Sequence, residues 1–211
     1  MIKELRIGNL IAKIPVIQGG MGVGISLSRL AGAVAKAGGV GIISTAQIGY
    51  RKEKYDISPQ ECNLEAIGEE IKKAKAIADG GIVGVNIMVA TTDYELYVKA
   101  AVDAGADIVI SGAGLPVSLP ELVSGSETKI APIVSSVKAA SIILRQWKKK
   151  YNRLPDVVVI EGPEAGGHLG FSKEELDTIT KEKYDTEIKA IIQYVNEFAK
   201  EYDAVIPVVV G

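Results

Sequence analysis

The chain's single histidine, His168, lies in a glycine-rich stretch, EGPEAGGHLG, which follows a short apolar run at residues 157–160. A lone histidine is more often structural than catalytic, but imidazole can take or give a proton near neutral pH and often acts as a general base. Gly166 and Gly167 permit backbone conformations that are closed to other residues, and Pro163 stiffens the turn. We therefore interpret His168 as a candidate catalytic residue on a loop of specified shape.

A second glycine-rich loop, QGGMGVG, occupies residues 18–24 and precedes a helical pattern that begins near Ser26. Glycines let the backbone approach a ligand closely, and a helix start offers amide donors. The loop is not a dinucleotide fingerprint, because Ile25 stands where the third glycine belongs, and it is not a P-loop, because no Gly-Lys-Ser/Thr follows. A tight strand-to-helix turn and a ligand-binding loop explain it equally well.

Two polar residues stand near the ends of apolar runs. Asn86 interrupts VGVNIMV, and a buried amide without a partner costs about 1–3 kcal/mol. Asn86 therefore either bonds to a neighbouring strand or contacts a ligand, and its place near a carboxyl end favours the ligand. Glu161 ends the run before the histidine loop, so we expect its carboxylate at the same edge of the sheet.

Short apolar runs that do not alternate with polar residues recur along the chain, each followed by a polar or glycine-rich loop. Strands buried on both faces have this pattern, which predicts a parallel sheet covered by helices. The runs are residues 14–17, 40–43, 82–87, 108–110, 130–134, 157–160 and 205–210.

Helical spacing of apolar residues separates these runs. Asn63 and Asp93 are expected helix N-caps, and Gly38, Gly80 and Gly105 are expected C-terminal stops. The clearest apolar faces are Leu64-Ile67-Ile71-Ala74-Ala78, Ala140-Leu144-Trp147-Tyr151 and Ile188-Ile191-Ile192-Val195-Phe198-Tyr202.

The alternation of strand and helix predicts an α/β fold, and two architectures compete. A doubly wound sheet has one dominant phosphate loop, whereas a (β/α)8 TIM barrel carries functional loops after many strands. Glycine-rich or polar loops follow several strands here, which favours the barrel. Only about seven strands are present, and such barrels typically need about 250 residues. We therefore expect residues 1–211 to be a single TIM-barrel domain, truncated at its C-terminus.

Composition excludes several classes of function. The 211 residues carry a net charge of −2, so no basic field for nucleic acid exists. One cysteine, Cys62, expected in a loop or just before a helix, forms no intramolecular disulfide and fits a cytoplasmic location. No uncharged apolar stretch reaches 18 residues, so we expect no membrane span. No ligand cluster for a metal is visible in the sequence.

The chain resembles the nitronate monooxygenase family, once called 2-nitropropane dioxygenases, over essentially its whole length. These are FMN-dependent TIM barrels, and their superfamily includes FMN-dependent enoyl-acyl-carrier-protein reductases. PVIQGGMG resembles the family's first-strand flavin loop, and GVNIMV resembles its third strand with a flavin-contacting asparagine. EGPEAGGHLG resembles its AGGH motif, the most specific of the three.

The resemblance implies roles for individual residues. His168 would be the catalytic base, and flavin contacts would come from Gly20, Met21, Asn86, Glu161, Gly166, Gly167 and Gly211. Glu161 stands where many members have glutamine, which can donate a hydrogen bond as ionised glutamate cannot. Gly211 matches the first glycine of the family's phosphate loop, and the sequence contains neither the rest of that loop nor the GTRF-like segment of strand eight.

Three functions follow from these observations. The first is FMN-dependent oxidation of alkyl nitronates or nitroalkanes with O2. The second keeps FMN but reduces enoyl-acyl carrier protein with NAD(P)H, and sequence separates these two poorly. The third is a non-catalytic, truncated fragment of such a barrel. The expected partners are a small-molecule substrate and O2, with no nucleic acid and no membrane. The oligomeric state stays open, a homo-oligomer included.

Overall fold

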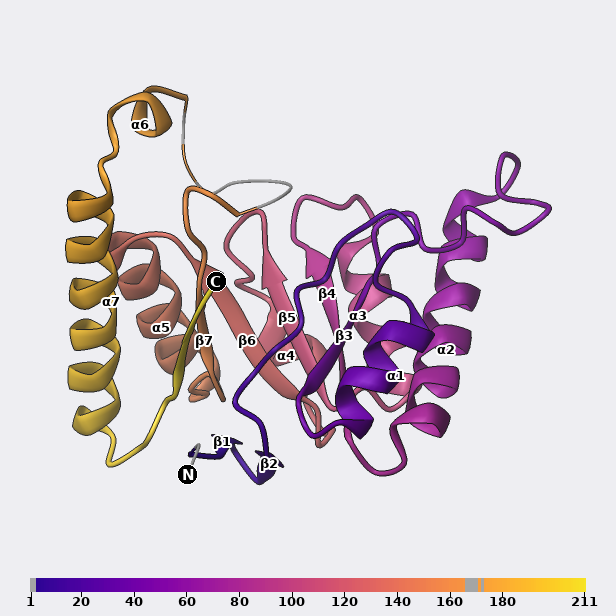
Figure 1. The fold of residues 1–211 in the computed structure, drawn as a ribbon, viewed down its shortest axis with the longest axis horizontal. Coiled ribbons are helices and arrows are strands. Elements are labelled where there is room, and N and C mark those ends of the chain that lie inside the picture. The colour runs from indigo at the N-terminus through magenta and orange to yellow at the C-terminus, as the bar shows by residue number, and fades with distance from the viewer. Residues whose placement is uncertain (1–2, 166–170, 172) are drawn as a thin grey trace.

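The computed structural model describes residues 3–165, 171 and 173–211 (Figure 1). Its strands are β1 (Leu5–Ile7), β2 (Leu10–Ala12), β3 (Val40–Ser44), β4 (Ile82–Met88), β5 (Ile108–Gly112), β6 (Lys129–Val134), β7 (Val158–Ile160) and β8 (Val208–Val210). Its helices are α1 (Ser28–Lys36), α2 (Pro59–Ala78), α3 (Tyr94–Asp103), α4 (Leu119–Leu122), α5 (Val137–Tyr151), α6 (Lys173–Thr178) and α7 (Lys181–Glu201).

Within these ranges, six strands form one parallel sheet in the order β3-β4-β5-β6-β7-β8. Each strand pairs with the next along the chain, so that Ser44 lies opposite Asn86, and Asn86 opposite Ile110. The connecting helices lie outside the curled sheet, with α1 and α2 flanking one side and α5 and α7 the other (Figure 1). This arrangement is the predicted α/β barrel type, in which the carboxyl ends of all strands meet at one face.

The segment predicted as the first strand, residues 14–17, forms a single parallel bridge with β3 instead of a strand. Val40 N donates to Val16 O at 2.9 Å, which aligns the two segments. Pro15 has no amide N–H, and Val16 N turns back to Ile14 O at 2.8 Å. Ile14 N and Gln18 N also donate across, to Gly38 O at 2.9 Å and to Val40 O at 3.0 Å. The local turn at Val16 between them limits the regular pairing to one bridge.

An antiparallel hairpin, β1–β2, covers the amino-terminal ends of the sheet and was not predicted from the sequence. Its turn residue Gly8 approaches Lys129 and Asp156, which lie at the starts of β6 and β7. Ile7 and Ala12 of the hairpin are buried inside the curled sheet. They pack there with Val40, Ile42, Ile82, Ile108, Ile110, Ala131 and Val157. The hairpin thus fills the interior of the curled sheet at the amino-terminal ends of its strands.

Helices pack on the outer face of the sheet much as their spacing predicts. Ile67, Ile71, Ala74 and Ala78 of α2 are buried, as are Ala140, Leu144 and Trp147 of α5 and Ile191, Val195 and Phe198 of α7. Gly38, Gly80 and Gly105 follow the ends of α1, α2 and α3 with φ of +98°, +86° and +80°. This left-handed conformation favours glycine, and the three predicted helix stops are confirmed.

Two expectations at the start of α2 are wrong. Cys62 and Asn63 lie inside the helix, which begins earlier, with Ser58 as N-cap and Pro59 in its first turn. Proline in the first turn is a start signal in its own right. Asn63 instead joins two other elements: Oδ1 accepts from Gly49 N at 2.8 Å, and Nδ2 donates to the Tyr97 hydroxyl at 2.7 Å. The predicted N-cap Asp93 does occupy that position in α3.

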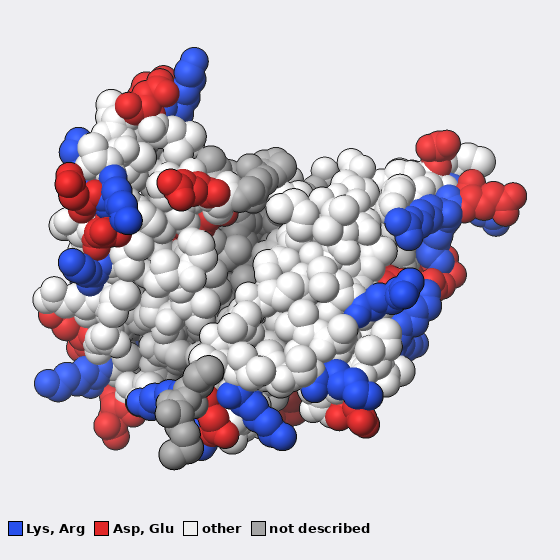
Figure 2. Space-filling model, viewed as in Figure 1, with Lys and Arg blue, Asp and Glu red and all other residues white. Residues whose placement is uncertain are grey.

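Charged side chains of both signs lie mostly around the rim of the face in Figure 2, and the described surface between them is largely uncharged. The segment before α1 carries five exposed apolar side chains: Ile14, Val16, Met21, Val23 and Ile25. In the described ranges, no helix is both long enough and apolar enough to cross a membrane.

Candidate active site

A cleft of ≈ 590 Å³ opens at the carboxyl ends of the sheet strands. This volume is within the usual range for small-molecule sites. Residues 17–23 form one side of it, and the ends of β7 and β8 form the opposite side. Its apolar floor consists of Ile42, Ile110, Ile133, Val159 and Val209, which point into the curled sheet. Among the described residues that line the cleft, Glu161 is the only charged one.

The glycine loop, residues 18–26, is braced by two side chains that sequence reasoning did not single out. Ser26 is 1% exposed, and its hydroxyl accepts from Met21 N at 3.0 Å and donates to Gly19 O at 3.1 Å. Gln18 donates to the Ser26 hydroxyl at 2.9 Å and accepts from Ile42 N at 3.1 Å. The only signal for them in the sequence is that polar residues begin and end an otherwise apolar loop.

Gly20 lies directly against Asn86 of β4. A Cβ on Gly20 would stand 2.5 Å from Asn86 Cβ, whereas a Cβ on Gly19 would have no neighbour within 4 Å. Real Cβ atoms essentially never come so close, so glycine at position 20 is required for this packing. Close packing of loop on strand thus explains Gly20 whether or not a ligand touches it.

Asn86 lines the cleft and is half-buried. Its backbone carbonyl accepts from Thr45 N at 3.2 Å and from the Thr45 hydroxyl at 3.1 Å. Within the described part of the chain, no group forms a hydrogen bond with its side-chain amide. The alternative of a bond to a neighbouring strand end is therefore not realised there, and the amide is open to the cleft.

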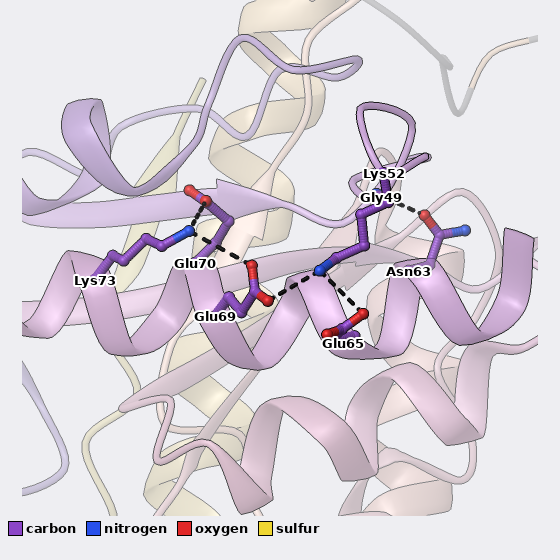
Figure 3. A network of polar contacts seen from close by, with 7 residues as sticks. All are labelled: Gly49, Lys52, Asn63, Glu65, Glu69, Glu70 and Lys73. Atoms are coloured by element: carbon purple, nitrogen blue, oxygen red, sulfur yellow. Dashed lines mark hydrogen bonds and ion pairs between the residues drawn. The ribbon is translucent and has the colours of Figure 1, made fainter. Parts of the chain in front are cut away.

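The long loop between β3 and α2, residues 45–58, is held against α2 by ion pairs (Figure 3). Lys52 Nζ lies 3.0 Å from Glu65 and 2.9 Å from Glu69. The hydrogen bond to Glu69 is the main cause that raises the pKa of Lys52. Tyr50 in this loop contacts the glycine loop, since a Cβ on Gly24 would stand 2.5 Å from the Tyr50 hydroxyl oxygen. The network therefore supports one side of the cleft from outside.

The opposite side is formed by the turn after β7 and the end of β8. Glu161 N donates to Val134 O at 3.0 Å, which places Glu161 at the mouth of the cleft. Gly211 N donates to Ile160 O at 3.0 Å, and Gly162 N donates to Gly211 O at 3.2 Å. These bonds bring the two predicted site residues Glu161 and Gly211 together.

Tyr184 in the first turn of α7 lies behind this turn. A Cβ on Gly162 would stand 2.9 Å from its hydroxyl oxygen. Burial raises the pKa of Tyr184, and the charges of Glu161 and Asp185 raise it further. Sequence reasoning missed this residue, although it extends the apolar face that begins at Ile188 by one helical turn.

The predicted site residues fall into two groups. Gly20, Met21, Asn86, Glu161 and Gly211 all line the one cleft. Gly166, Gly167 and His168 lie outside the described residues. In the part of the chain that the structure describes, no three His, Cys, Asp or Glu residues are grouped so as to hold a metal ion.

The cleft fits the ring system of the flavin that the resemblance implies. A planar aromatic ring can lie on the apolar floor, with the Asn86 amide and Glu161 at its polar edges, and a side chain at Gly20 would disturb this cradle. The described part of the cleft offers few donors for a phosphate. Its lining contains no Lys or Arg, and the backbone amides of Gly162 and Gly211 already donate to backbone carbonyls.

Known structures share this fold. FabK from Thermotoga maritima superposes with a TM-score of 0.66 at 25% identity, over 93% of this chain and 50% of that chain. A nitroalkane oxidase from Streptomyces ansochromogenes gives a TM-score of 0.65 at 18% identity, over 94% of this chain and 58% of that one. These similarities confirm the TIM-barrel type of fold that the sequence predicts.

A curated relative from Mycobacterium tuberculosis, (3aS,4S,5R,7aS)-5-hydroxy-7a-methyl-1-oxo-octahydro-1H-indene-4-carboxyl-CoA dehydrogenase, is 29% identical over 156 residues. The aligned part is 74% of this chain but 38% of the relative. The chain thus spans less than half of that relative's length and half of the FabK chain. The sequence model of one family, nitronate monooxygenase, matches residues 3–210, and the chain belongs to that family.

Proposed function

We propose that the protein is an FMN-dependent oxidoreductase that oxidises alkyl nitronates, or the parent nitroalkanes, with O2. The observation that carries the proposal is that one cleft is lined by five of the seven residues for which family resemblance implies flavin contacts: Gly20, Met21, Asn86, Glu161 and Gly211. Family membership over residues 3–210 supports the same reaction class.

FMN, when bound, would supply the two-electron acceptor for the substrate and the reductant for O2. The chain's own residues would do the rest. Asn86 would hydrogen-bond a polar edge of the ring through its open amide, and Glu161 would face another edge. The apolar floor would exclude water from the underside of the ring. His168 would take the acidic α-proton from the carbon of a neutral nitroalkane, leaving the nitronate anion.

The direct test is to express the protein in a flavin-supplemented culture and to measure its visible spectrum and its O2 uptake with alkyl nitronates. Flavin absorbance that co-purifies, together with nitronate-dependent O2 uptake, is the expected result. Bound flavin without nitronate-dependent uptake would overturn the proposed reaction while leaving the cofactor in place.

A second candidate is an FMN- and NAD(P)H-dependent enoyl-thioester reductase. The likeness to FabK, and to a relative that is named as a dehydrogenase of a CoA thioester, favours it. Anaerobic mixing with NADH or NADPH separates the two candidates. Rapid bleaching of the flavin band supports the reductase, whereas bleaching by a nitronate alone supports the first proposal.

We also propose a cytoplasmic location. Cys62, the only cysteine in the sequence, is a buried free thiol in α2. A reducing compartment keeps such thiols free.

A further inference from the structure

One buried hydroxyl beside the cleft has no role in the proposed chemistry. Among the residues that the structure describes, the Tyr184 hydroxyl oxygen is the only buried side-chain polar atom without a hydrogen-bond partner. The ring of Phe171 packs edge-on against the tyrosine ring, with centroids 6.3 Å apart. Buried phenols usually donate a hydrogen bond, so this exception requires a reason.

The hydroxyl lies against the two segments that form this side of the cleft. It would stand 2.9 Å from a Cβ on Gly162, and Gly211 O would stand 3.1 Å from the same point. Tyr184 is not among the residues that line the cleft. Any effect of its hydroxyl on a bound molecule must therefore pass through a neighbouring group that does line it.

Glu161 is the neighbouring group with the right chemistry. It lines the cleft and directly precedes Gly162, the residue that lies against the Tyr184 hydroxyl. After burial, the charge of Glu161 is the next cause that raises the pKa of the phenol. Asp185, the other carboxylate that acts on Tyr184, is exposed on α7 and is not among the residues that line the cleft. A phenol that keeps its proton can donate a hydrogen bond to a carboxylate that comes within reach.

We propose that Tyr184 is a positioning residue for Glu161: when flavin occupies the cleft, the phenolic hydroxyl donates to the Glu161 carboxylate and holds it toward the ring as a hydrogen-bond acceptor. This inference rests on the proposed function only for the identity of the bound group. The proposed hydrogen bond from Tyr184 gives Glu161 a defined role as an acceptor toward the flavin, at a position where a glutamine could donate a hydrogen bond instead. Tyr184 and Glu161 together then set the hydrogen-bond polarity at one edge of the ring.

The test combines Tyr184→Phe with Glu161→Gln in a double-mutant cycle on the flavin-loaded protein. Tyr184→Phe should shift the visible flavin spectrum and midpoint potential and raise the FMN dissociation constant about two- to tenfold, the scale of one hydrogen bond. In the Glu161→Gln background, the same substitution should change none of the three. Equal effects in both backgrounds would show that Tyr184 has only a structural role.

A second measurement needs no flavin. In protein labelled with 13C at tyrosine Cζ, the Tyr184 signal is assigned by its loss in Tyr184→Phe and is titrated in the unliganded chain. Glu161→Gln should lower the pKa of Tyr184, and Asp185→Asn, the matched removal of a charge on the same helix, should lower it less. A chain that shows this coupling but binds no flavin overturns the proposed function. A chain that binds flavin without the coupling overturns the role of Tyr184.

Discussion

The two sides of the cleft are built in different ways. The glycine-loop wall, residues 18–26, packs closely on β4 at Gly20, and the hydroxyl of its buried Ser26 is hydrogen-bonded within the wall. The β7–β8 wall, residues 161–165 with Gly211, follows two three-residue strands, and a buried hydroxyl without a hydrogen-bond partner lies behind it. A wall that is satisfied without a ligand serves mainly as architecture, whereas a wall with an unsatisfied donor is adapted to a ligand. We therefore expect substitutions in the first wall to change stability and those in the second to change chemistry.

The largest effect should follow from His168→Ala, in the segment that continues from the β7–β8 wall. Turnover of a neutral nitroalkane should fall by about 100-fold or more, the scale of the loss of a general base. Turnover of the preformed nitronate should fall less, because its proton is already gone. Flavin affinity and the melting temperature should stay nearly unchanged. Full activity with a melting temperature lowered by several degrees would instead identify a structural histidine.

Gly20→Ala is the corresponding test of the glycine-loop wall. The added Cβ would stand 2.5 Å from Asn86 Cβ, so the loop or β4 must shift. Such overpacking typically costs about 1–3 kcal/mol, and in a domain of this size each kcal/mol lowers the melting temperature by about 2–4 °C. Gly19→Ala, where a Cβ would have no neighbour within 4 Å, is the matched control and should leave the melting temperature unchanged. Equal melting temperatures for both variants would contradict the architectural role of Gly20.

A somewhat smaller effect is expected for Ser26→Ala. The Ser26 hydroxyl accepts hydrogen bonds from Met21 N and Gln18 Nε2 and donates one to Gly19 O. Its removal leaves the Met21 amide without this acceptor. An unsatisfied buried donor costs about 1–3 kcal/mol, and partial access of water to this loop places the expected loss near the lower end. Urea unfolding measures it, with exposed Ser124→Ala as a control expected within about 0.5 kcal/mol of the parent. A loss of nitronate turnover without a loss of stability would assign Ser26 to the chemistry instead.

The sequence predicted the repeating part of this fold well and its irregular parts poorly. Runs of β-branched residues and helical faces such as Ile67, Ile71 and Ala74 report burial directly, because burial on both faces of a strand or along one stripe of a helix sets the pattern. The hairpin β1–β2 was missed because three-residue strands are too short for a periodic signal. The bridge at residues 14–17 was read as a strand because apolarity does not report whether amide groups such as that of Val16 are free to pair.

The sequence predicted which motif residues of the candidate site lie near one another, but it did not predict the residues that only tertiary contacts bring there. Gly20, Asn86 and Glu161 stand at loops or strand ends, and a parallel sheet brings such positions together at one face. Tyr184 lies 23 residues after Glu161 in the sequence on a different element, and only the docking of α7 places its hydroxyl beside the turn after β7. No local pattern distinguishes a buried unpaired phenol from an ordinary core tyrosine.

The smallest expected effect compares two flavins on the 211-residue chain. The described lining of the cleft contains no Lys or Arg, and the amides of Gly162 and Gly211 already donate to backbone carbonyls. A phosphate group should therefore add little to binding, and the dissociation constants of FMN and riboflavin should agree within about threefold, a difference of less than 1 kcal/mol. Quenching of flavin fluorescence measures both constants, at low and at high salt, because an ionic phosphate contact weakens as salt rises. FMN binding that is tenfold or more tighter than riboflavin binding, and sensitive to salt, would show that a phosphate site exists in this chain and that the β7–β8 wall is more complete than its described residues indicate.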